Sequence, residues 1–177
     1  MNYISFFSDE NFYYCYQENG KIYRGKNSKK FVPNLKYFIS IFATLFLGNI
    51  INTIFEGKIS IYICLLLIFI GLFLSLFIGK MLYNSIEKKS HANLKEIILS
   101  DNEFNEYVLK GKHQFEVQKT IIIFMLFANI ILFLIFCYSF NLVWWFLGVV
   151  MNVLLVLTIQ WIKPVGKSKF YKIMIKH

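Results

Sequence analysis

The sequence has little charge, little proline and few cysteines. Only 16% of its 177 residues are charged, and it holds 2 prolines and 3 cysteines; an ordinary soluble domain is about one quarter charged. Three cysteines in a chain of this length exclude a disulfide scaffold, and 57% hydrophobic residues exclude an intrinsically disordered chain. The low charge also excludes an ordinary cytosolic enzyme, so the class that remains is an integral membrane protein.

Charge is missing altogether from three long apolar runs, residues 37–55, 59–79 and 120–162. A helix crosses a hydrocarbon core of about 30 Å with about 20 apolar residues. The first two runs therefore supply one span each and the third supplies two, with the turn formers Ser139 and Asn141 between them. We predict an all-α transmembrane fold, a four-helix membrane bundle with spans at residues 35–56, 59–80, 120–138 and 142–162.

The positive charges are sorted along the chain. Of the 19 lysines and arginines, all but Lys58 lie before the first apolar run, between the second and third runs, or after the third. Positive residues stay on the cytoplasmic side of a membrane. We therefore expect a multi-pass protein of the cell membrane with both termini cytoplasmic, so that residues 1–34, 81–119 and 163–177 lie inside the cell.

The first cytoplasmic segment, residues 1–34, predicts a small β-hairpin. Two strand-forming stretches, residues 13–17 and 21–24, flank Asn19-Gly20. This dipeptide favours a two-residue hairpin turn because both positions adopt positive φ.

The second cytoplasmic segment, residues 81–119, predicts an amphipathic helical loop. Leu94, Ile97 and Ile98 fall at helical spacing. Ser100 followed by Glu103 matches a capping box, and we expect the helix that it opens to stop at Gly111, a favoured residue just beyond a helix end. The basic tail, residues 163–177, predicts an interfacial segment.

The candidate interaction site is a set of asparagines inside the spans: Asn49, Asn52, Asn129 and Asn152. Buried amides in a membrane hydrogen-bond across helices. They either hold the bundle together or form a polar seam that another membrane protein recognises.

A second candidate set comprises lysines near the membrane surface: Lys29, Lys30, Lys167, Lys169 and Lys172. Each lysine near an anionic leaflet contributes about 1 kcal/mol of binding, so we expect contacts with anionic lipid. For Lys29 and Lys30 a role as topology determinants is the alternative. Nucleic acid is not an expected partner, because the basic residues flank the spans.

Neither catalysis nor a cofactor is expected. The three apolar runs, residues 37–55, 59–79 and 120–162, contain no Asp, Glu, Lys, Arg or His, and a proton-coupled carrier keeps such groups at mid-depth. The chain also has no H-E-x-x-H motif for zinc. The sequence therefore predicts no catalytic, cofactor or metal site.

In its plan the chain resembles the tandem five-transmembrane family of bacterial membrane proteins. The shared features are the Tyr-rich hairpin at residues 13–23, the Phe31-Val32-Pro33 entry and two early spans before a Lys-rich loop. The chain departs from that family by having four spans. The resemblance implies an immunity protein that neutralises a secreted, membrane-targeting antibacterial toxin by binding it in the bilayer. An accessory subunit of a transporter or secretion complex is the alternative, and a channel-forming homo-oligomer is a third.

Overall fold

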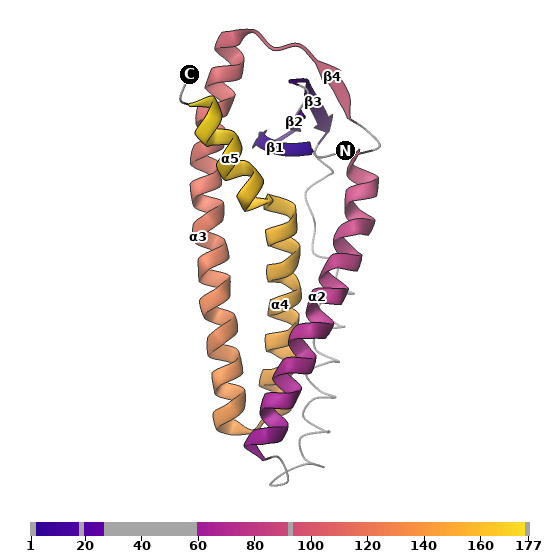
Figure 1. The fold of residues 1–177 in the computed structure, drawn as a ribbon, viewed down its shortest axis with the longest axis vertical. Helices are drawn as coiled ribbons and strands as arrows, with labels where there is room; N and C mark the ends of the chain where they lie inside the picture. The colour runs from indigo at the N-terminus through magenta and orange to yellow at the C-terminus, as the bar shows by residue number, and fades with distance from the viewer. Residues whose placement is uncertain (1–2, 18–19, 27–59, 92–93, 176–177) are drawn as a thin grey trace. The chain divides into compact units, whose positions relative to one another are not determined.

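The computed structural model describes residues 3–17, 20–26, 60–91 and 94–175 (Figure 1). The chain forms two compact units. The sheet unit draws on residues 1–30, 82–122 and 158–177, and the helix unit on residues 31–81 and 123–157. The predicted first span, residues 35–56, lies outside the described residues.

Four helices follow one another in the second part of the chain: α2 (Ile61–His91), α3 (Asp101–Ser139), α4 (Leu142–Ile162) and α5 (Pro164–Met174). Within the described ranges, three helical stretches are long and apolar enough to cross a membrane, and they begin at Ile61, Asp101 and Leu142. This confirms apolar helices at the predicted spans 59–80, 120–138 and 142–162.

The predicted turn between α3 and α4 is confirmed. Phe140 adopts a left-handed conformation (φ 53°) that ends α3. The side-chain oxygen of Asn141 then accepts a hydrogen bond from the backbone N–H of Val143 at 2.9 Å, which satisfies a free donor at the start of α4. The chain thus reverses direction between Ser139, the last residue of α3, and Leu142, the first residue of α4.

The helix unit is held together by close packing of small and aromatic residues. Cys64 and Phe136 are fully buried and pack with Leu142. A Cβ atom on Gly148 would stand 2.8 Å from the Phe133 ring, so a larger residue would displace this ring. Small residues allow such close approach between apolar helices, where van der Waals packing drives association.

The sheet unit contains a four-stranded antiparallel sheet in the order β1-β2-β3-β4. Its strands are β1 (Tyr3–Ser8), β2 (Phe12–Gln17), β3 (Ile22–Lys26) and β4 (Lys95–Ile97). The predicted hairpin is confirmed as β2 and β3, and Gly20 has the positive φ (84°) that the turn requires. β1 and β4 extend this hairpin into a sheet.

Two expectations for residues 81–119 are wrong. Residues 95–97 are the strand β4 and not a helix, because they pair with β3: Ile22 lies opposite Ile97 and Arg24 opposite Lys95. α3 also continues through Gly111 into the apolar stretch instead of stopping there. The capping box itself is confirmed, since the Ser100 side chain accepts from the Glu103 N–H and the Glu103 carboxylate accepts from the Ser100 N–H.

Aromatic packing joins the sheet to α3 and α5. The register of β1 against β2 shifts between Ser5 and Phe7, which leaves Phe6 as a β-bulge. The bulge lets two consecutive aromatics, Phe6 and Phe7, both be buried. The Phe6 ring meets Phe104 and Phe170 at 5.8 and 5.3 Å between centroids. Its carbonyl accepts a hydrogen bond from the Tyr171 hydroxyl.

Candidate functional site

Two asparagines of the predicted polar seam lie in the helix unit, and both make internal contacts. Asn129 is 5% exposed and donates to the Gly148 carbonyl at 3.1 Å. Asn152 is 8% exposed and donates to the Ser75 hydroxyl. The other two, Asn49 and Asn52, lie outside the described residues. The two described amides thus make the internal hydrogen bonds that the first of the two roles requires, and the partner-binding role stays a prediction.

The predicted lipid-contacting lysines differ in exposure. Lys169 and Lys172 are exposed on α5, but Lys167 is only 7% exposed. Lys167 is thus buried where Lys169 and Lys172 are exposed, and its contact with anionic lipid stays a prediction. α5 packs against the sheet through Phe170 and Tyr171. Lys167 lies on the same buried side of the helix as these two aromatic residues. Lys29 and Lys30 fall outside the described part of the chain.

The sheet unit contains a cavity of about 190 Å³ with several polar side chains in its lining. We call it the Lys167 cavity. Strands β1 and β2, the ends of α2 and α4, the middle of α3 and the start of α5 line it. Its polar side chains include Cys15, Glu87, Gln114, Gln118, Lys163 and Lys167.

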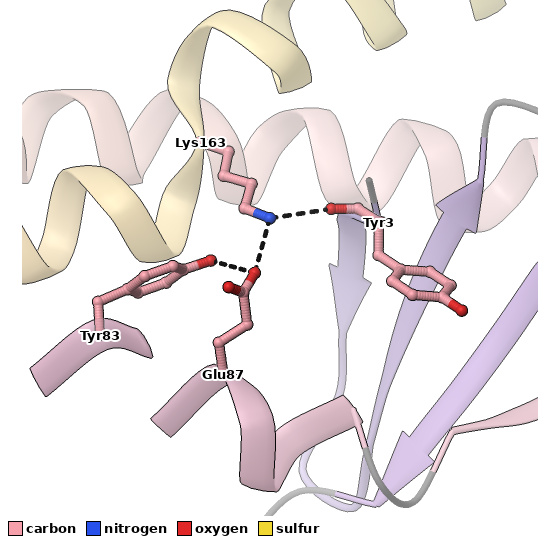
Figure 2. Close-up of polar contacts among 4 residues, drawn as sticks. All are labelled: Tyr3, Tyr83, Glu87 and Lys163. Atoms are coloured by element: carbon pink, nitrogen blue, oxygen red, sulfur yellow. Dashed lines mark hydrogen bonds and ion pairs between the residues drawn. The ribbon is translucent and has the colours of Figure 1, made fainter. Parts of the chain in front are cut away.

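An ion pair forms one wall of this cavity. Figure 2 shows the Glu87 carboxylate between two donors, the Lys163 ammonium at 3.0 Å and the Tyr83 hydroxyl at 2.6 Å. Lys163 also donates to the carbonyl of Tyr3 at 3.4 Å, which ties β1 to this wall. Because Lys163 has left-handed backbone geometry (φ 49°), it ends α4 and turns the chain into α5.

Glutamines of α3 complete the polar lining. Gln114 donates to the Ser8 carbonyl at 2.7 Å and accepts from the Ser8 N–H at 3.3 Å, so it acts as a partner for the end of β1. Gln118 lies one turn further along α3 and accepts a hydrogen bond from the Lys167 ammonium at 3.0 Å.

Burial shifts the pKa values of Cys15 and Lys167, which both line this cavity. It raises the pKa of the Cys15 thiol to about 12, so this thiol is neutral at physiological pH and a poor nucleophile. Burial also lowers the pKa of Lys167 from 10.5 to about 8. The cavity thus holds an inert thiol beside an ammonium group that has lost most of its water.

Sequence reasoning missed this cavity. Its lining comes from segments that are far apart in the chain, and only the fold brings Glu87, Gln118 and Lys163 together. One local signal was present: Pro164 directly after Lys163 favours a new helix, because proline suits the first helical position. That signal predicts α5 but not what α5 packs against.

A comparison of this chain with known protein families, curated protein sequences and solved structures found no match.

Proposed function

We propose that this chain is a multi-pass protein of the cell membrane, with both termini cytoplasmic, that acts by binding another protein within the bilayer. The role that fits this best is that of an immunity protein that neutralises a secreted, membrane-targeting antibacterial toxin. Its resemblance in plan to the tandem five-transmembrane family supports the same role.

The observation that carries the proposal is a row of aromatic side chains on α2, which we call the α2 aromatic row. Phe69, Phe73 and Phe77 are 71%, 68% and 65% exposed. Their spacing of four residues puts them on one face of the helix. Contact with lipid tails needs only apolar side chains, which leucine, isoleucine and valine supply equally well. Aromatic rings additionally supply a large contact area and a defined shape, which are the properties of anchor residues in protein interfaces.

The internal contacts of the helix unit support a lateral mode of binding. Asn129, Asn152 and Ser75 are already hydrogen-bonded within the unit. A toxin in the bilayer would therefore meet apolar and aromatic surface, and recognition would depend on packing.

The test is protection of a toxin-sensitive bacterial strain. Expression of the chain should restore growth in the presence of a toxin encoded beside it. Replacing the α2 aromatic row by leucine, as Phe69→Leu, Phe73→Leu and Phe77→Leu together, should abolish protection while membrane insertion is unchanged, because leucine is equally apolar.

A matched control comes from α3. Phe124 and Phe127 are 71% and 64% exposed, and their replacement by leucine should leave protection intact. Full protection by the α2 variant would refute the aromatic row as the binding surface. Failure of the unmodified chain against every neighbouring toxin would refute the immunity role.

A second candidate function, accessory subunit of a transporter or secretion complex, is favoured by one feature of the sheet. β4 is an end strand, and Ile98 beside it is 98% exposed. The edge of a sheet can accept an extended segment of another protein. Purification in mild detergent should then recover a larger complex that the Ile98→Asp variant loses, and a clean monomer would exclude this function.

A further inference from the structure

Lys167 is a buried cation with a neutral partner. It is 7% exposed, and its ammonium donates to the Gln118 carbonyl oxygen at 3.0 Å. Among the described residues, the ion pairs of the sheet unit join other lysines to acids and do not include Lys167. Burial of an ammonium group is unfavourable unless an opposite charge compensates it.

The surroundings of Lys167 add positive charge. Lys163 precedes it by one helical turn, and the first turn of α5 contains no acidic residue. The N-terminus of a helix carries a partial positive charge, which favours an anion at that place. Lys167 therefore lies where a second cation is least favourable and an anion most favourable.

The carboxylate in the cavity wall does not offset this charge. Glu87 is engaged by Lys163 at 3.0 Å and by the Tyr83 hydroxyl at 2.6 Å. The buried Cys15 thiol is neutral at pH 7, because burial raises its pKa to about 12. With two lysines and one glutamate, the lining of the cavity carries a net charge of +1.

The cavity has room for a small anion. Its volume of about 190 Å³ corresponds to roughly six water molecules. This is below the size of a drug-like ligand pocket, which starts at about 300 Å³, so a single charged group fits and a large solute does not.

We propose that the Lys167 cavity binds a phosphate-type oxyanion, with the Lys167 ammonium as its main ligand. The source that the sequence favours is the phosphodiester of an anionic phospholipid headgroup. Trp161 and Tyr83 both line the cavity, Trp161 in the last turn of α4 and Tyr83 four residues beyond the apolar run that ends at Gly79. Tryptophan and tyrosine gather at the level of the headgroups.

The experiment uses the purified full chain in a neutral detergent and follows tryptophan fluorescence during titration. The three probes are short-chain phosphatidylglycerol, short-chain phosphatidylcholine and inorganic phosphate. Saturable binding of phosphatidylglycerol alone identifies the lipid headgroup as the ligand, and binding of inorganic phosphate with equal affinity identifies the free ion. Absence of binding by both anionic probes overturns the proposal.

Variants of opposite expected effect link the binding to the cavity. Lys167→Met should weaken binding at least about tenfold, since hydrogen bonds to charged groups contribute this much. Glu87→Gln should strengthen binding about fivefold, because it removes the negative charge from the wall; a variant that is merely misfolded cannot bind more tightly. Lys110→Met and Lys112→Met, at exposed lysines of α3 that do not line the cavity, are the matched controls and should bind as the unmodified chain does. Equal binding by Lys167→Met and the unmodified chain would contradict the proposal.

Discussion

The two units bury polar groups of different kinds. The helix unit buries neutral groups that bond to one another, such as Asn152 to Ser75 and Asn129 to a backbone carbonyl. The sheet unit buries a tyrosine, Tyr171, and an ammonium group, Lys167, which lines a polar cavity. A buried charge is tolerated only where water or an ion can reach it. The helix unit, with neutral buried groups, is therefore suited to a lipid environment, and the sheet unit, with a buried ammonium group, is suited to the boundary with water.

The largest expected effect comes from a substitution at Gly111, which should destabilise the sheet unit and leave the helix unit unchanged. A Cβ atom at this position would collide with the backbone carbonyl of Phe6 and stand 2.8 Å from the Tyr171 hydroxyl. Gly111→Ala should therefore lower the free energy of unfolding by about 4 kcal/mol, from overpacking and a lost hydrogen bond. Hydrogen exchange should rise in β1 and β2 and stay unchanged in residues 123–157.

The matched control is the other helical glycine of the sheet unit. A Cβ atom on Gly166 would lie 3.7 Å from the Ile4 side chain, an ordinary contact. Gly166→Ala should stabilise α5 by up to about 1 kcal/mol through helix propensity. Equal destabilisation by both variants would show that β1 does not pack closely on α3 at Gly111.

The next effect concerns the charge of Lys167 and its dependence on pH. Burial lowers the pKa of Lys167 from 10.5 to about 8, so between these pH values the unfolded chain binds the proton and the folded chain does not. The free energy of unfolding therefore rises with pH in this window, and the contribution of the group is about 3 kcal/mol. Below pH 8 the cost of burying the charge is fully present.

Lys167→Met isolates this contribution. In neutral detergent without phosphate or anionic lipid, the stability of the variant relative to the unmodified chain should fall by up to about 3 kcal/mol from pH 7 to pH 10. Taking the difference cancels the titration of the other groups around the cavity, Cys15, Tyr83 and Glu87. Lys172→Met, on the exposed face, should show no such trend, and a flat difference for Lys167→Met would refute the burial of its charge.

The features that local sequence determines were predictable. Hydropathy located the three long apolar helices among the described residues, because an uncharged run of about 20 residues is the length that a membrane-crossing helix needs. Asn19-Gly20 located the hairpin and Ser100 with Glu103 located the start of α3, since a turn and a cap each depend on residues within a few positions.

The features that depend on distant partners were not predictable. Residues 94–98 have helical spacing, yet residues 95–97 form β4 because β3 offers a partner strand. Gly111 was expected to end a helix, whereas its purpose is to let the carbonyl of Phe6 approach α3. The Lys167 cavity likewise depends on contacts between segments up to 160 residues apart, as between Tyr3 and Lys163.

A third prediction tests whether the hydrogen bond between Asn152 and Ser75 in the helix unit contributes to stability. Asn152→Leu should lower stability by about 1–2 kcal/mol, because a buried amide hydrogen bond between membrane helices contributes on that order. The Ser75 hydroxyl keeps a partner in the variant, since it donates to the Leu72 carbonyl at 2.8 Å. A double-mutant cycle with Ser75→Ala, measured by unfolding in increasing SDS, should give a coupling of about 1 kcal/mol.

Asn129 supplies the control for this cycle. It donates to the backbone of Gly148 and not to Ser75, so Asn129→Leu combined with Ser75→Ala should be additive. Additivity for Asn152 as well would mean that the contact with Ser75 contributes nothing, and it would free Asn152 for the partner-binding role that the sequence suggested.

The smallest expected effect is at the start of α3, which belongs to the sheet unit and faces water. Ser100→Ala removes the acceptor of the Glu103 N–H and should cost about 0.5–1 kcal/mol, seen as faster hydrogen exchange in the first turn only.

The hydrogen bonds from Ser100 lower the pKa of Glu103, so the carboxylate stabilises the cap above its unfolded pKa. This contribution is lost as pH falls through the lowered value, and the difference between the variant and the unmodified chain should shrink in acid. Ser139→Ala at the other end of α3 should leave this turn unchanged, and an equal response to both variants would show that the capping box is not what holds the first turn.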